Sequence, residues 1–131
     1  MTSPLWPRIV RWLIAVTAIG VGGGCPRLGI CVKSPDQRAS SFVIEVAEGS
    51  DCNGPALVTR VLVRRVSDGI VLWNIGSQSI DGVELTSVRY GELPAGFDQG
   101  LVAQPLTPGD HVGISVNGRG TSGGIDVTIT P

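Results

Sequence analysis

Residues 57–75 read LVTRVLVRRVSDGIVLWNI, and this stretch decides the fold. Its first half alternates between the two faces of a strand, with Leu57, Val61 and Val63 on one face. An Asp-Gly pair ending at Gly69 then supplies a tight reversal, because glycine adopts a positive φ at little cost. The second half returns as a partner strand. The stretch therefore predicts an antiparallel hairpin whose core face carries Leu57, Val61 and Val63.

Short apolar runs between turn signals continue on both sides of this hairpin. The expected strands are residues 42–47, 57–66, 70–75, 83–90, 101–106, 111–116 and 125–130. Pro105 places the fifth of them at a sheet edge, because proline cannot donate to a ladder. About seven strands at roughly ten-residue spacing predict an all-β fold, an antiparallel immunoglobulin-like or fibronectin-III-like sandwich, with a barrel as the alternative.

Composition agrees with one ordered β domain. The 131 residues have room for a single core, and 42% of them are hydrophobic while only 16% are charged, which disfavours disorder. The 19 glycines and 9 prolines imply many turns, and Val, Ile and Thr dominate between them.

The amino terminus has the features of a secretory signal. Residues 1–25 read MTSPLWPRIVRWLIAVTAIGVGGGC, with Arg8 and Arg11 as the positive region. The uncharged apolar run at 12–21 is shorter than the roughly 20 residues that a transmembrane helix needs. Small residues then lead to Cys25, which completes the order of a signal segment. A buried N-terminal helix of the fold is the alternative.

This segment resembles the signals of bacterial lipoproteins, which end in an aliphatic residue, two small residues and a lipid-modified cysteine. Gly23 and Gly24 match the small positions and Cys25 matches the modified one, whereas Gly22 stands where the family prefers an aliphatic residue. Pro26 after the cysteine is unusual for the family. The resemblance implies palmitate-type acylation at Cys25 and anchoring in a bacterial membrane. An unlipidated periplasmic or secreted protein is the alternative.

These features divide the chain into a signal peptide (1–24), a lead-in or tether (25–40) and a sandwich domain (41–131). Removing Arg8 and Arg11 with the signal changes the formal net charge from −1 to −3. This mild acidity argues against nucleic acid and against electrostatic docking on anionic lipid. The expected partners are the membrane, through the lipid anchor, and another envelope protein.

The three cysteines predict one disulfide. If Cys25 carries lipid, Cys31 and Cys52 remain as an even pair in an oxidising compartment. Their Cα atoms must then approach within about 7 Å, which requires the chain to fold back after the first strand. The competing bridges join Cys25 to Cys31 or to Cys52. A zinc site is disfavoured, because there is one histidine and no C-x-x-C.

The body of the chain is similar to the small immunoglobulin-like domains of bacterial lipoproteins. The similarity rests on Trp73 in the third expected strand and on a Pro-Gly turn ending at Gly109, before the sixth. Two features of true immunoglobulin domains are missing. No cysteine follows Trp73, and the sixth strand begins with His111 where a corner tyrosine is expected.

Catalytic patterns are weak, so the sequence predicts no enzyme, no cofactor and no metal. His111 is the single histidine, and neighbouring Asp110 and Ser115 lack the G-x-S-x-G context of a nucleophile. The glycines of residues 117–124 (NGRGTSGG) lack a phosphate loop's Lys-Ser/Thr ending, and the segment reads as a flexible hairpin loop. The acidic pairs Glu45 with Glu48 and Glu92 with Asp98 fall in turns or on solvent faces.

A long loop expected at residues 91–100 (GELPAGFDQG) is the candidate binding segment. It carries Leu93 and Phe97 among small and polar residues, and the competing interpretation tucks both under the loop as part of the core. Trp73 is interpreted as core in preference to a ligand platform.

Three functions remain open. The first is a non-catalytic envelope lipoprotein that serves as a binding or accessory module. The second is a secreted or tethered inhibitor that inserts the loop at 91–100 or 117–124 into a hydrolase. The third is a small hydrolase using His111.

Overall fold

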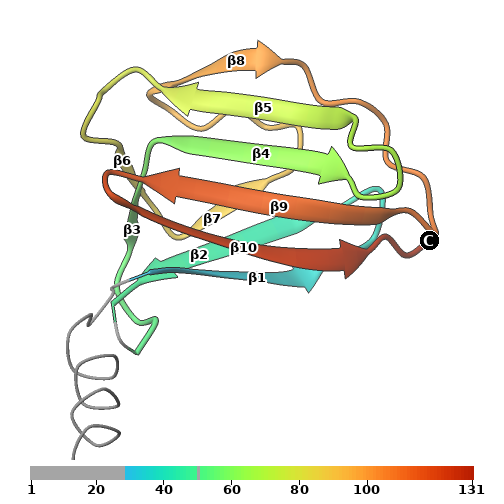
Figure 1. Ribbon diagram of the computed structural model, residues 1–131, viewed down its shortest axis with the longest axis horizontal. Helices are drawn as coiled ribbons and strands as arrows, with labels where there is room; N and C mark the ends of the chain where they lie inside the picture. Colours follow the sequence, from blue (N-terminus) through green and yellow to red (C-terminus); the bar gives the residue numbers. More distant parts are fainter. Residues whose placement is uncertain (1–28, 50) are drawn as a thin grey trace, which may run out of the picture.

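The computed structural model describes residues 29–49 and 51–131, and these fold into ten β-strands (Figure 1). The strands are β1 (Ile30–Asp36), β2 (Val43–Glu48), β3 (Ala56–Val58), β4 (Arg60–Arg65), β5 (Val71–Ser77), β6 (Val83–Leu85), β7 (Ser87–Arg89), β8 (Phe97–Leu101), β9 (His111–Gly118) and β10 (Thr121–Thr128). They form an all-β antiparallel sandwich, as the sequence predicts, with ten strands in the described residues in place of about seven.

The strand order follows the immunoglobulin pattern. One sheet has the order β1-β2-β7, and the opposing sheet has the order β10-β9-β4-β5-β8. Taken along the chain, these strands occupy the positions A, B and E facing G, F, C and C′. β8 is an additional edge strand beside β5, and β3 and β6 pair with each other as a short ribbon.

The hairpin predicted from residues 57–75 is present as β4 and β5. Val61 faces Ile75 and Val63 faces Trp73 across the pair. Gly69 has a φ of 73° in the turn, so the glycine occupies the position that requires left-handed backbone. The amide of Arg65 donates to the carbonyl of Ile70 at 2.8 Å and closes the turn.

The expected strand at 57–66 is divided at Thr59. Its first part, β3, pairs with β6, and its second part, β4, enters the larger sheet. The Thr59 amide donates to the carbonyl of Asn117 at 2.7 Å, which carries the chain across to β9. The alternation of buried and exposed side chains shifts by one residue at this point. Ala56 and Val58 are therefore buried before it, and Leu57 is 44% exposed. The placement of Leu57 in the core was therefore wrong.

The expected strand at 83–90 is divided in the same way. β6 pairs with β3, and after Thr86 the chain continues as β7, which pairs with β2. The Thr86 carbonyl accepts from the amide of Val46 at 3.0 Å. Each of these two segments thus leaves the small ribbon for a different sheet.

The lead-in expected at residues 25–40 contains a strand. Residues 30–36 form β1, which pairs with β2 at the edge of the smaller sheet. Beyond β1, Arg38 and Thr130 form a parallel bridge near the chain end. Alternation is weak in β1 because most of its side chains are only partly buried, so periodicity did not reveal it.

The region of residues 91–106 is arranged differently from the expectation. Phe97–Leu101 forms the edge strand β8, whereas an edge strand had been expected at 101–106. The following residues run irregularly beside β5, with the Gln104 amide donating to the carbonyl of Leu72 at 2.8 Å. The buried Phe97 side chain anchors this strand.

The expectation of a flexible loop at residues 117–124 is also wrong. β9 and β10 pair up to Gly118 and Thr121, which leaves Arg119 and Gly120 as a two-residue turn. Gly123 lies in β10 against β1, and a Cβ there would overlap the carbonyl oxygen of Ile30. Glycine is needed at this position because the two backbones approach too closely for a side chain.

The core lies between the two sheets. Its fully buried large side chains are Trp73, Phe42, Ile44, Leu72, Ile75, Ile114, Ile129, Val58, Val61, Val63, Val112 and Val116. The rings of Phe42 and Trp73 lie 5.9 Å and 5.2 Å from the ring of Tyr90, which links the two sheets. The interpretation of Trp73 as a core residue is confirmed.

Candidate functional site

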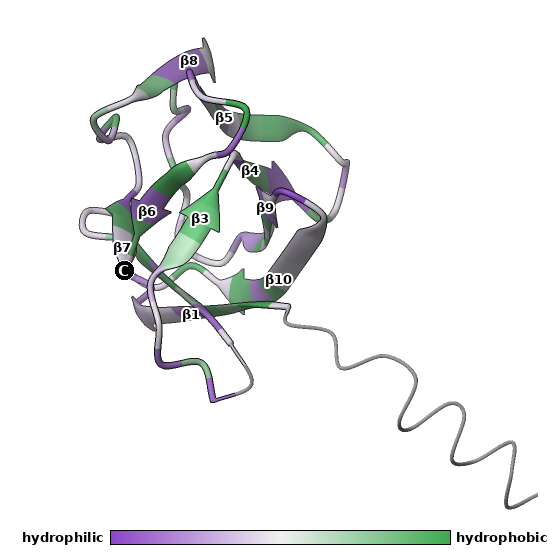
Figure 2. Cartoon of the chain, turned by 90° about the vertical axis from the view of Figure 1, so that its left-hand side faces the viewer, coloured by the Kyte–Doolittle hydropathy of each residue, from purple (hydrophilic) through white to green (hydrophobic). Residues whose placement is uncertain are grey.

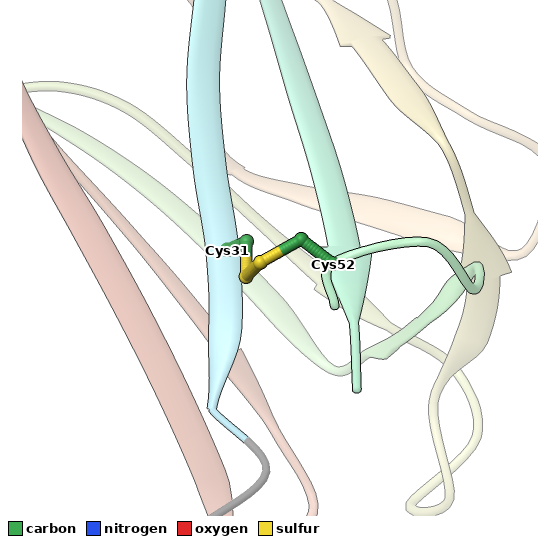
Figure 3. The surroundings of a disulfide bond; sticks show 2 residues. All are labelled: Cys31 and Cys52. Carbon is green, nitrogen blue, oxygen red and sulfur yellow. A yellow bond between two sulfur atoms is a disulfide. The ribbon is translucent and has the colours of Figure 1, made fainter. Parts of the chain in front are cut away.

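Cys31 and Cys52 form a disulfide, as the sequence predicts, and their Cα atoms lie 5.8 Å apart (Figure 3). The required fold-back exists after β2, where the amide of Glu48 donates to the carbonyl of Gly54 at 2.9 Å. Cys52 has a φ of 56°, the one positive value at a non-glycine position among the described residues. The bridge therefore ties β1 to the turn between β2 and β3.

The bridge takes up both Cys31 and Cys52, so the competing pairings of Cys25 with either of them are wrong. Cys25 itself, and the signal segment at 1–24, lie outside the described residues. Within residues 29–49 and 51–131, no helix has the length and apolar character needed to cross a membrane.

The two residues of the candidate binding segment have different environments. Phe97 is 3% exposed and belongs to the core. Leu93 is 44% exposed and lines a hollow of about 290 Å³ beside β7. The hollow is lined by Val43, Ser87, Val88, Arg89, Glu92, Leu93 and Pro94, and we call it the Leu93 hollow. It combines apolar side chains with an ion pair of 3.4 Å between Arg89 and Glu92.

Tyr90 directly follows Arg89 of the Leu93 hollow in the chain, and its ring packs against Phe42 and Trp73. Its hydroxyl donates to the carbonyl of Gln104 at 2.6 Å and lies 3.2 Å from the carbonyl of Leu72. Burial raises the pKa of Tyr90 to about 12. Sequence reasoning assigned Tyr90 only to an alternating strand. Its two carbonyl partners come from other segments, so no local pattern could have identified them.

His111 is an exposed residue at the start of β9. Its Nδ1 atom lies 2.9 Å from Oγ1 of Thr128 on the neighbouring strand. Ser115 is four residues further along β9, about 13 Å away for an extended strand. Asp110 is directed to Arg65, at 3.6 Å. The structure thus does not bring the three side chains together as a triad.

Three further polar candidates, Arg119, Glu48 and Asp98, have structural partners. Arg119 forms an ion pair with Asp81 of the β5–β6 turn. Glu48 accepts from the amide of Leu57 at 3.3 Å, and Asp98 accepts from Gln78 at 3.0 Å. The described part of the chain contains no group of three or more His, Cys, Asp or Glu side chains arranged to hold a metal ion.

Comparison with family models, with curated proteins and with solved structures finds no match to this chain.

Proposed function

We propose that this chain is a non-catalytic lipoprotein of a bacterial envelope. In this proposal the signal segment exports the chain, Cys25 receives the lipid, and the sandwich acts as a binding or accessory module for another envelope component. One observation carries the proposal. The disulfide uses Cys31 and Cys52 and leaves a single cysteine, located where a lipoprotein signal ends. A structural disulfide also supports an oxidising compartment.

The mature amino terminus tests this proposal. We expect intact-mass analysis of the exported chain to find residues 25–131 with acyl chains on Cys25. Metabolic labelling with palmitate should label the wild type and the Cys31→Ala/Cys52→Ala variant, because neither change touches the modified residue. The Cys25→Ser variant should take up no label. A mature chain that keeps an unmodified thiol at Cys25 would overturn the proposal.

The proposal assigns partner contact to the Leu93 hollow. Support comes from its composition, since an exposed leucine beside a proline is flanked by a charged pair, as in an apolar contact with a polar rim. Leu93 lies on a short loop held by the rigid sheet, which lowers the ordering cost of binding.

A crosslinking experiment in intact cells tests this assignment. We expect Leu93→Asp to lower the recovered amount of a reproducible crosslinked partner at least tenfold relative to the wild type. Leu101→Asp is the matched control, because Leu101 is also exposed but lies on β8. Equal recovery of the partner with Leu93→Asp and with the wild type would show that the contact surface lies elsewhere.

A further inference from the structure

The chain enters the sandwich at one end, which we call the tether end. It comprises the start of β1 together with the β2–β3, β5–β6 and β9–β10 turns, on the left in Figure 1 and facing the viewer in Figure 2. A Cβ on Gly29 would lie 3.6 Å from the carbonyl oxygen of Ser122, and one on Gly118 would lie 3.2 Å from Cδ1 of Ile30. The Arg119–Asp81 ion pair joins two of these turns.

The tether between Cys25 and Gly29 is short. Four residue steps reach at most about 14 Å when fully extended. A lipid on Cys25 would therefore hold the start of β1 within roughly that distance of the bilayer. The tether alone does not fix how the sandwich is tilted on that surface.

Ile80 is the most exposed large apolar side chain of the described residues, at 84%. It lies at the tip of the β5–β6 turn. The turn is well organised, with the Gly82 amide donating to the Ser79 carbonyl at 3.1 Å and the Asp81 amide to Ser79 Oγ at 3.2 Å. A single exposed isoleucine is ordinary on a protein surface. Its position at the end that the tether holds near lipid is what gives it significance.

We propose that the tether end rests on the bilayer and that Ile80 inserts into the lipid interface. The inference rests on the proposed lipid at Cys25. Burial of one isoleucine gives a preference on the order of tenfold, too weak to recruit a free protein. Lipid attachment makes the contact intramolecular, so this preference is sufficient to orient an anchored domain.

Charge at the tether end is mixed. Asp51 and Glu84 are exposed there, Arg119 is paired with Asp81, and the exposed Arg60 lies at the start of β4, opposite Asn117 beside the β9–β10 turn. Because charges of both signs are present, the bilayer contact is carried by the apolar side chain.

The orientation leaves the Leu93 hollow directed away from the membrane. Val43, which lines the hollow, pairs with Asp36 at the far end of β1 and with Arg89 on β7. The seven residues of β1 separate this point from the tether end by about 20 Å. The proposed partner surface thus stays accessible to a second envelope protein.

Tryptophan fluorescence tests the inference in the full lipid-modified chain. Residues 25–131 contain one tryptophan, the buried Trp73, which gives a constant background. Ile80→Trp adds a reporter at the tether end. Ile70→Trp is the matched control, because Ile70 is 52% exposed beside the β4–β5 turn at the opposite end. Both proteins are reconstituted into phosphatidylcholine vesicles with brominated acyl chains.

We expect Ile80→Trp emission to shift to the blue and to be quenched at least twofold more than Ile70→Trp emission. Equal quenching in the two variants, with acylation of Cys25 verified by mass, would overturn the orientation and leave the proposed function intact. A chain without lipid at Cys25 would overturn both. Thermal unfolding of each variant confirms that it is folded.

Discussion

Tyr90 shows how one side chain can join several segments. Its ring contacts Phe42 and Trp73, and its hydroxyl reaches the carbonyls of Leu72 and Gln104. The hydroxyl thereby holds the irregular chain after β8 against β5. A buried phenol of this kind is stable only in its neutral form, which is why burial raises its pKa.

We predict an alkaline loss of stability that depends on Tyr90. The folded pKa of about 12 exceeds the ordinary value of 10.0, so the neutral form stabilises the fold fully below pH 10. This contribution is lost as the pH rises from about 10 through about 12. Tyr90 is the single tyrosine, so absorbance at 295 nm reports its titration directly.

Tyr90→Phe is the comparison for this prediction. It should cost about 1 kcal/mol at neutral pH because a hydrogen bond is lost. The difference between the two proteins should narrow above pH 10, measured by urea unfolding at each pH. A constant difference from pH 8 to pH 12 would contradict the prediction.

Gly123 lies where the backbones of β10 and β1 approach too closely to leave room for a side chain. We predict that Gly123→Ala lowers the free energy of unfolding by about 3 kcal/mol, because a methyl group would push β10 away from the backbone of β1. Gly76→Ala is the control, since its Cβ would lie 3.7 Å from the nearest atom. The control should remain within about 1 kcal/mol of the wild type in denaturant unfolding. Equal effects of the two substitutions would remove the close approach as the reason for Gly123.

At the scale of elements, the disulfide secures β1, the first strand of the described residues. β1 lies at the edge of its sheet and pairs with β2. The bridge adds a covalent link from β1 to the β2–β3 turn and closes a loop with a sequence separation of 21 residues. An edge strand is paired on one side only and opens more readily than a central strand, so this link protects β1 against local unfolding.

We predict that Cys31→Ala/Cys52→Ala lowers the free energy of unfolding by about 3 kcal/mol, as the chain-entropy model gives for a loop of this size. Reduction of the wild type should have the same effect in urea unfolding. Cys31→Ala/Cys52→Gly should recover about 1 kcal/mol of this loss, because glycine tolerates the φ of 56° at position 52. A glycine variant no more stable than the alanine variant would show that the turn relaxes once the bridge is gone.

At the scale of the whole molecule, the domain begins earlier than residue 41. β1 completes the smaller sheet, and Arg38 bridges to Thr130 near the chain end. Both contacts lie in the part expected to be a lead-in. The sandwich is closed along one side only when these residues are present.

We predict that a chain starting at residue 29 folds cooperatively and that a chain starting at residue 41 does not. The shorter chain loses β1, the disulfide and the cover over Gly123 together. Circular dichroism during thermal unfolding distinguishes the two. A cooperative transition in the shorter chain at the temperature of the longer one would show that β1 is dispensable.

Much of the fold and less of the candidate site could be read from the sequence. The β4–β5 hairpin, the turn at Gly69 and the strands near 42–47, 111–116 and 125–130 follow from short-range alternation and turn chemistry. The disulfide followed from counting cysteines. These features depend on neighbours in the chain, and a local pattern therefore records them.

Tertiary structure decided the rest. Whether a strand continues or changes sheets at Thr59 depends on a carbonyl of β9, 58 residues away, and side-chain alternation carries no trace of that partner. In the sequence, Gly123 suggests a loop. In the structure, it is required because β1 packs directly against it. Leu93 and Phe97 look alike in the sequence, and only packing buries one and exposes the other. Long-range contacts set these outcomes, because the free energy of burial depends on which surfaces meet and not on the spacing of residues along the chain.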